Sequence, residues 1–314
     1  LRLFGDLQYR YVSYQAWGVN DNFISEEVGM QPIDVDKQYH FFNPRAGVSY
    51  TLAERNNFYF SFAVAQKEPT RSDFTDRYKF AADDTYPSSE KLYDWELGYQ
   101  YTAPRLSLGV NLYYMKYKDQ LVPTGMVNDD SNALNTNVPD SYRRGVELSA
   151  SWRATGWFTV GANATFSQNR IENYVDALKD SPTYGKELGD MTIAYSPDVI
   201  ANAFLNFHHR GFEAVFHTQH VGKQYFTNNE NDALSLDAYC VTNLNLAYTF
   251  RTRSARSVRL GLLINNLFNA EYESNGYGYS YMDTWSGPAP VRIDEAYYFP
   301  QAPLNVLANV TVKF

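Results

Sequence analysis

The chain has little of what several protein classes require. Its single cysteine, Cys240, excludes an internal disulfide framework and a cysteine-based metal cluster. Its longest uninterrupted apolar run is four residues, as at Leu112–Met115, whereas a membrane-spanning helix needs about 20. Positive charge is also scarce, because 27 Lys and Arg face 35 Asp and Glu and leave a net charge of −8. A nucleic-acid binder would need a basic face, so we expect no nucleic-acid partner.

Aromatic residues, by contrast, are abundant: the 314 residues include 27 Tyr, 20 Phe and 5 Trp. Such a composition excludes a disordered or low-complexity chain. The mean hydropathy is nevertheless only −0.46. A chain rich in aromatics but poor in apolar runs must distribute its apolar residues in a pattern.

That pattern is an alternation of apolar and polar residues, which is typical of β-strands because successive side chains face opposite ways. Between residues 92 and 102, for example, Tyr93, Trp95 and Leu97 share one face, and Asp94 and Glu96 share the other. The alternation predicts twelve strands, at residues 3–11, 46–52, 58–64, 92–102, 106–114, 146–152, 158–166, 199–207, 212–216, 240–250, 258–264 and 304–314.

The connections between these strands alternate in length. Short turns are predicted near residues 53–57, 103–105, 153–156, 208–211 and 251–256. Long polar loops are predicted near residues 20–38, 67–90, 119–140, 168–197, 222–238 and 269–302. Strands of about ten residues, joined by short turns at one end and long loops at the other, are typical of transmembrane β-barrels.

Charge is confined to one register of the strands. The apolar faces carry no charged residue, and the strand charges fall on the opposite faces, at Asp94, Glu96, Glu147, Glu213, Arg259 and Lys313. A Lys or Arg facing lipid at mid-bilayer costs about 2–4 kcal/mol, whereas one facing a wet lumen costs little. A water-soluble sandwich would place more Lys, Glu and Thr on its polar face, and here that face carries mainly Asn, Ser, Gly and Gln. We therefore predict an all-β protein, a transmembrane antiparallel β-barrel.

Tyr and Trp collect where hydrocarbon meets headgroups, since each has an apolar body and a polar tip. Seven such residues fall near predicted strand ends, as girdle residues should: Tyr50, Tyr93, Tyr101, Tyr114, Trp152, Trp157 and Tyr248.

Three segments carry a resemblance to a known family. Residues 264–272 (INNLFNAEY), residues 299–303 (FPQAP) and the ending Val310–Phe314 resemble the C-terminal end of TonB-dependent outer-membrane receptors. Residues 67–74 (KEPTRSDF) are similar to a segment common in such receptors from Bacteroidetes. The resemblance implies a bacterial outer-membrane location, with INNLFN closing the penultimate strand. It also implies that the last strand, ending at Phe314, is presented to the barrel-assembly machinery.

The same family has barrels of 22 strands and an N-terminal plug domain that couples to TonB. The chain has about twelve predicted strands, and residue 1 already lies inside a strand pattern. We therefore expect residues 1–314 to be the C-terminal portion of such a barrel, with the plug and the N-terminal strands absent.

No catalytic or metal-binding set emerges from the sequence. His208 and His209 fall in a predicted turn, and His217 and His220 lie on opposite faces of a strand, which disfavours a shared metal ion. A haem receptor stays open as a minor alternative. The oxygen-rich clusters at residues 83–84 and 128–132 fit solvated turns better than Ca²⁺ sites. No Gly-x-Ser-x-Gly elbow occurs, so we predict no enzyme, no cofactor and no metal.

The long loops are the expected ligand surface. Aromatic side chains can stack on flat or sugar-like ligands, and an arginine can meet an anionic group. The candidate ligand-binding residues are Arg71, Tyr225, Phe226, Tyr277, Tyr279, Tyr281 and Trp285. The alternative for the aromatic residues is that they pack the loops together or lie at the membrane rim.

The leading functional hypothesis is a receptor that takes up a scarce small molecule, such as an iron–siderophore chelate, with TonB coupling through the missing plug. Its partners would be outer-membrane lipid, the TonB complex, the barrel-assembly machinery and the ligand. A passive porin or self-contained twelve-stranded pore is the main alternative, and an outer-membrane hydrolase ranks below both.

Overall fold

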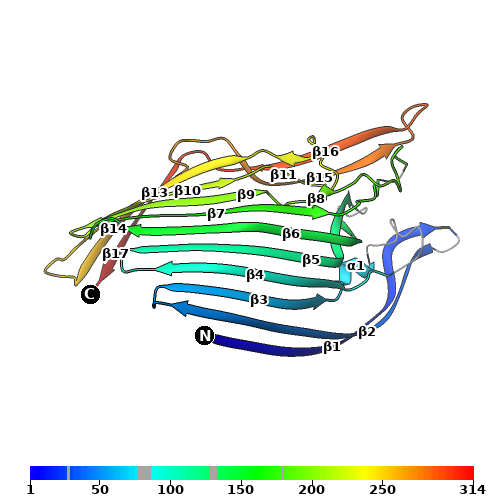
Figure 1. The fold of residues 1–314 in the computed structure, drawn as a ribbon. Helices are drawn as coiled ribbons and strands as arrows, with labels where there is room; N and C mark the ends of the chain where they lie inside the picture. Colours follow the sequence, from blue (N-terminus) through cyan, green and yellow to red (C-terminus); the bar gives the residue numbers. More distant parts are fainter. Residues whose placement is uncertain (27–28, 76–85, 128–132, 179) are drawn as a thin grey trace.

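One large antiparallel sheet dominates the structure, a computed structural model that describes residues 1–26, 29–75, 86–127, 133–178 and 180–314 (Figure 1). We call the main path of this sheet the wall; its strands follow the order β1-β2-β3-β4-β5-β6-β7-β9-β10-β13-β14-β17. The short β8 pairs with β7 and makes it a thirteen-stranded sheet. The wall strands are β1 (Arg2–Ser25), β2 (Gly29–Leu52), β3 (Asn56–Lys67), β4 (Glu90–Thr102), β5 (Leu106–Val127), β6 (Ala133–Arg153), β7 (Phe158–Ile171), β9 (Val199–His209), β10 (Phe212–Val221), β13 (Tyr239–Phe250), β14 (Ser257–Asn265) and β17 (Asn305–Lys313), with β8 at Met191–Thr192.

The twelve predicted strands are the twelve strands of this path, in the predicted order. β1 and β17 form the edges of the wall, and within the described residues neither pairs with the other. Among those residues no helix is both long enough and apolar enough to cross a membrane. The one helix in the described part of the chain is the single turn α1 (Arg71–Thr75).

Short turns gather at one end of the wall, which we call the turn end, and long connections gather at the other, the loop end, as predicted (Figure 1). The β9–β10 turn shows why so few residues are needed there. His209 pairs with Phe212, and the two residues between them have positive φ, at 49° for Arg210 and 86° for Gly211. This is the two-residue hairpin geometry that matches the twist of the flanking strands. His208 and His209 therefore end a strand, and the prediction that placed them in the turn was wrong.

Two predicted long loops are largely continuations of the wall strands. β1 and β2 continue as a paired ribbon through most of residues 20–38, and β5 and β6 extend into residues 119–140. These strands reach 21–24 residues, well over twice the predicted length. The sequence of these extensions mixes polar residues, Gly and Pro with only a few apolar residues, among them the buried Val35, Val122 and Val138, so it lacks the regular one-sided apolar alternation of the wall strands although the backbone ladder continues.

The apolar face of the wall is exposed, as a lipid-facing surface requires. Leu97, Leu112 and Val310 have 53%, 44% and 65% of their surface accessible. A continuous apolar surface of this kind is rare on a water-soluble monomer. It fits the outward band of a membrane barrel.

Aromatic rings border this band at both ends. At the loop end, Trp95 lies 5.2 Å from Phe62 and 5.7 Å from Tyr114, measured between ring centroids, so rings from three neighbouring strands form a row. At the turn end, Trp152 and Trp157 are 52% and 48% exposed. Such rows are the expected girdles at the two membrane interfaces.

The INNLFN segment ends β14 through backbone and side-chain hydrogen bonds. Asn266 is buried and has a positive φ of 51°. Its side-chain oxygen accepts from the Ala270 amide at 2.8 Å, and its own amide donates to Asn243 Oδ1 at 2.9 Å. Asn269 Oδ1 accepts from the Leu304 amide at 2.9 Å, just before β17 begins. The motif therefore stops the penultimate wall strand, as the resemblance implied, and holds the start of the last one.

The two faces of β6 allow a direct test of orientation. Leu148 points to the apolar side, midway between Trp152 and Arg144, and the adjacent Ser149 points to the polar side; both are exposed. We expect Leu148→Arg to lower the free energy of unfolding by about 2–4 kcal/mol in bilayers, because it places a cation in hydrocarbon. Ser149→Arg, the matched control, should cost less than about 1 kcal/mol. Denaturant unfolding in phospholipid vesicles measures both, and equal losses would contradict the assigned orientation.

Candidate functional site

Three long connections interlock at the loop end of the wall. Asn228, in residues 222–238, is fully buried; its Oδ1 accepts from the Ala194 amide at 2.7 Å, and its Nδ2 donates to the Pro123 carbonyl. Glu230 accepts from the Thr192 amide at 3.0 Å and pairs with Arg170. Burial opposes the charge of Glu230, but these donors hold the pKa of its carboxyl below the usual range. The loops thus form a fixed layer.

A hairpin of β15 (Glu273–Asp283) and β16 (Val291–Pro300) rises from this layer (Figure 1). Gly276 and Gly278 lie on its inner face. A Cβ atom at Gly276 would lie 2.7 Å from the Phe226 ring, and one at Gly278 would lie 2.9 Å from both Phe226 and Leu234. Any larger residue at either position would push the hairpin away. The glycines of the Gly–Tyr run therefore allow the hairpin to pack on the cluster of Phe226, Leu234 and Leu236.

The tyrosines of the same run point the other way. Tyr277 stacks on Tyr297 with ring centroids 4.9 Å apart, Tyr279 lies 6.4 Å from Tyr297, and Tyr281 lies 6.4 Å from Tyr279. Trp285 is 73% exposed and nearly parallel to Tyr281, at 6.2 Å. We call this surface, formed by Tyr277, Tyr279, Tyr281, Trp285, Glu295 and Tyr297, the tyrosine face.

Glu295 lies at the centre of the tyrosine face. Tyr279 and Tyr297 donate their hydroxyls to Glu295 Oε2 at 2.7 and 2.8 Å, and Tyr281 donates to Oε1 at 3.3 Å. These donors, Tyr279 first, hold the pKa of the Glu295 carboxyl below its usual range. The carboxylate in turn raises the pKa of the Tyr279 hydroxyl. The hydroxyls of Tyr279, Tyr281 and Tyr297 are thereby held around one carboxylate, at the centre of an electron-rich aromatic surface.

The structure divides the predicted ligand residues into several groups. Tyr277, Tyr279, Tyr281 and Trp285 are brought together on the tyrosine face. Phe226 is only 1% exposed and packs beneath the hairpin, so it supports the tyrosine face and offers no surface to a ligand. The contacts of Phe226 therefore agree with the alternative that the loop aromatics pack the loops together.

The other two predicted residues lie apart. Tyr225 belongs to β11 (Gln224–Tyr225), which pairs with β12 (Ser235–Leu236), and the Lys223 ammonium lies 5.0 Å from the centre of its ring. Arg71 is exposed on α1, a helix that lies against β6.

The segment around Arg71 has a structural role that its sequence explains. Thr70 precedes α1 and forms a capping arrangement with Asp73, whose Oδ2 accepts from the Thr70 amide at 2.6 Å. Phe74, 2% exposed, stacks on Tyr14 at 5.1 Å. The KEPTRSDF motif therefore anchors the connection between β3 and β4 against the wall.

Two residues of the tyrosine face, Glu295 and Tyr297, were missed from the sequence. Residues 269–302 were treated as an irregular loop, so the pairing of β15 with β16 was not anticipated. The signal that could have found them is the period-two spacing of Ile293, Glu295, Tyr297 and Phe299.

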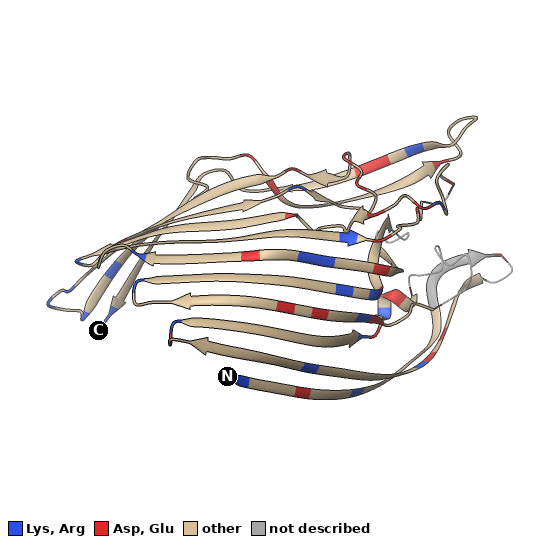
Figure 2. Ribbon diagram, viewed as in Figure 1, with Lys and Arg blue, Asp and Glu red and all other residues tan. Residues whose placement is uncertain are grey.

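Below the loops, the polar face of the wall holds a hollow of about 340 Å³ whose lining includes Glu96, Arg143, Glu147 and Asn169. Arg143 donates to Ser196 Oγ at 2.9 Å and to Asn169 Oδ1 at 3.3 Å. Figure 2 shows acidic and basic residues within the span of the sheet. The hollow gives the wall a hydrated polar surface that continues inward from the loop end.

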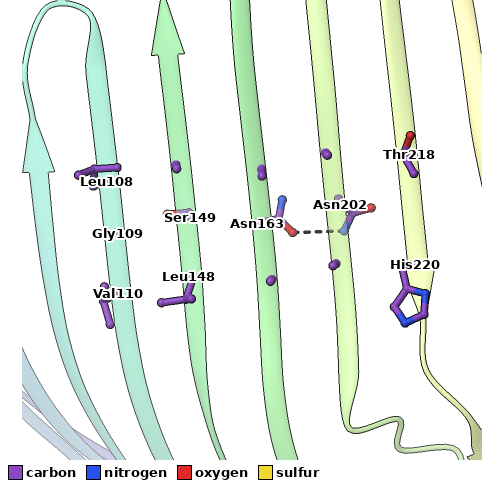
Figure 3. Close-up of a pocket in the computed structure, with 14 residues that line it drawn as sticks. Leu108, Gly109, Val110, Leu148, Ser149, Asn163, Asn202, Thr218 and His220 are labelled. Carbon is purple, nitrogen blue, oxygen red and sulfur yellow. Dashed lines mark hydrogen bonds between the residues drawn. The ribbon is translucent and has the colours of Figure 1, made fainter. Parts of the chain in front are cut away.

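A second hollow, of about 560 Å³, lies on the apolar face and includes five alanines, Ala150, Ala162, Ala164, Ala201 and Ala203 (Figure 3). Thr218 and His220 close one side of it (Figure 3). It opens to the lipid side, and none of its lining residues belongs to the tyrosine face.

Metal ligands do not converge in the described part of the chain, where no group of three or more His, Cys, Asp or Glu could hold an ion. His217 pairs with Asn243 and His220 with Cys240, which places the two histidines on opposite faces, as predicted. The oxygen-rich clusters at residues 83–84 and 128–132 lie outside the described residues.

The Glu295 network makes a prediction about pH. Ionising Tyr279 would put two negative charges in contact. The hydrogen bond from Tyr279 to Glu295 therefore stabilises the folded protein fully below the ordinary tyrosine pKa of about 10, and this stabilisation is lost as pH rises through the higher pKa of Tyr279 in the folded protein. We expect Glu295→Gln to lower the Tyr279 pKa. Asp283→Asn, on the same hairpin, should leave it unchanged. ¹³C-tyrosine NMR from about pH 8 to pH 12 measures this, with Tyr279→Phe assigning the resonance; identical titrations in all variants would refute the network.

Comparison with known proteins agrees with this architecture. The family model described as TonB dependent receptor-like, beta-barrel matches residues 1–267. The fold is similar to the ferric-catecholate import receptor Fiu of E. coli K12 (TM-score 0.67, 18% identity, 98% of this chain and 42% of that one). It is also similar to the ferric yersiniabactin uptake receptor FyuA of Yersinia pestis (0.68, 18%, 99% and 43%) and to the copper transporter OprC (0.70, 18%, 98% and 44%).

The chain thus spans less than half the length of these three structures. Members of the matched family are β-barrel proteins of the Gram-negative outer membrane and are transporters, not enzymes. With a matching family model over most of its length and a wall of the corresponding fold, the chain belongs to the TonB-dependent receptors, within their outer-membrane β-barrel.

Proposed function

We propose that the protein is an outer-membrane receptor that binds a scarce small molecule, an iron chelate of the siderophore type, at its long loops and imports it with TonB coupling. The observation that carries this proposal is the tyrosine face. It is exposed, its rings are held by Glu295, and it lies at the end of the wall where the long connections gather. Flat aromatic rings and ring-bearing chelates stack favourably.

A route inward supports transport. The polar face of the wall begins below the loops and carries the hollow around Arg143 and Glu147. A polar lumen lets a hydrophilic chelate pass without contact with hydrocarbon. The outward apolar face keeps the wall in the membrane.

We further propose that residues 1–314 form the C-terminal portion of a 22-stranded barrel whose plug couples to TonB, with the last strand presented to the barrel-assembly machinery. Edge strands in hydrocarbon must have their backbone groups paired. Because β1 and β17 are not paired with each other within the described residues, further strands would complete the ring. The alternative, a passive twelve-stranded pore, requires β1 to pair with β17. The intact mass of the native protein separates the two, since a plug and about ten further strands would more than double the 36.0 kDa of this chain.

The ligand site is tested by substitution on the tyrosine face. Tyr281→Ala removes a stacked ring and one hydrogen bond to Glu295, and we expect it to weaken binding of a synthetic ferric tris-catecholate about tenfold. Tyr184→Ala, an exposed loop tyrosine outside the tyrosine face, is the control and should change the affinity less than about twofold. Isothermal titration calorimetry of the native protein in detergent gives both values. Equal affinities in the two variants would exclude the tyrosine face as the site.

A further inference from the structure

The turn end of the wall is strongly basic in a chain whose net charge is −8. The five short turns and their flanking residues contain a single acidic residue, Glu54, against seven arginines: Arg55, Arg105, Arg153, Arg210, Arg251, Arg253 and Arg256. In Figure 2 the turns at this end carry blue segments, whereas red and blue are mixed at the loop end.

The turn arginines are exposed and, within the described residues, no ion pair or side-chain hydrogen bond engages them. Cations toward the loop end are instead paired: Lys116 with Asp140 and Glu172, and Arg170 with Glu230. The turn end therefore presents cationic charge that the fold itself does not neutralise. Such charge attracts anions from outside the protein.

The arginines lie at the level of the turn-end aromatic girdle. Trp152 adjoins Arg153, Trp157 closes the same turn, and Tyr248, which is 48% exposed, lies just before Arg251. Exposed Trp and Tyr mark the boundary between hydrocarbon and headgroups. The unpaired cations are therefore held at the depth of lipid headgroups, on the side where the turns emerge.

One part of this surface is hollowed. A cavity of about 790 Å³ lies among the ends of β13, β14 and β17, and its lining includes Arg251, Arg256 and Lys313, with no acidic residue. The hydroxyl-bearing residues Thr249 and Ser257 also line it. We call this cavity the basic hollow.

Short turns lie on the periplasmic side of outer-membrane barrels. We propose that the basic hollow binds the phosphate of an anionic phospholipid headgroup in the periplasmic leaflet. Two guanidinium groups donate in the fork geometry that matches phosphate oxygens. Lys313 belongs to the lumen-facing register, but it is the last residue of β17 and lines the same cavity, so its long side chain adds a third charge at the level of the turns. The Phe250 and Phe314 side chains complete the lining and offer an apolar surface to the glycerol and the first acyl carbons. A phospholipid would contact both the cationic and the apolar residues of this lining, whereas a free phosphate would contact only the cationic ones.

The test compares lipids and variants on the intact native protein in a neutral detergent. Native mass spectrometry should show phosphatidylglycerol bound at least tenfold more tightly than phosphatidylcholine. Each cation near an anionic lipid contributes roughly a factor of five, so Arg251→Gln with Arg256→Gln should weaken phosphatidylglycerol binding about 25-fold. Lys313→Gln alone should weaken it about fivefold.

The matched control is the double substitution Arg55→Gln with Arg105→Gln, which removes the same charge from turns outside the basic hollow. It should weaken binding less than about threefold, because only long-range attraction is lost. Heat-modifiable mobility on gels verifies that each variant is folded, and the Lys313→Gln result stands if the double variant does not fold. Equal losses in both double variants, equal binding of the two lipids, or displacement of the lipid by millimolar inorganic phosphate would overturn the proposal.

Discussion

The pairing of backbone groups within hydrocarbon is the constraint on which the rest of this structure depends. A strand in lipid has no water to satisfy its N–H and C=O groups, so every wall strand must be flanked by another. The ten inner strands of the wall meet this requirement by pairing on both sides in chain order, whereas β1 and β17 each pair on one side within the described residues. Side chains then have only two directions, and the environment on each side sorts them: apolar residues toward lipid, polar residues toward the lumen.

Beyond the hydrocarbon this constraint ends, and the chain uses other means of support. At the turn end, connections are as short as the two residues Arg210 and Gly211. At the loop end, the connections pack on each other through small apolar clusters and buried polar groups such as Asn228. The Gly–Tyr run links the two functions of this layer. Its glycines permit close packing on Phe226, and its tyrosines are thereby turned outward and held around Glu295.

Sequence reasoning was strongest where a side chain had only two possible directions. The strand order, the lipid-facing register and the separation of His217 from His220 all follow from a period of two. It was weakest in the long extensions of β1–β2 and β5–β6, where polar residues, Gly and Pro interrupt the regular apolar alternation and the segments were predicted as loops. It could not decide between ligand contact and loop packing for Phe226, which the structure buries, because an aromatic residue in a loop looks the same in the sequence in either role.

The sequence by itself determined the membrane-spanning wall, its inside and outside, and the end at which the long loops lie, because these depend on local alternation and connection length. Only the tertiary structure decided which loop aromatics form one surface. Glu295, Tyr279 and Tyr297 come together through the pairing of β15 with β16, and Phe226 is buried by contact with a hairpin about 50 residues further along the chain. Such long-range contacts depend on the fit of two distant segments, and no local period records that fit.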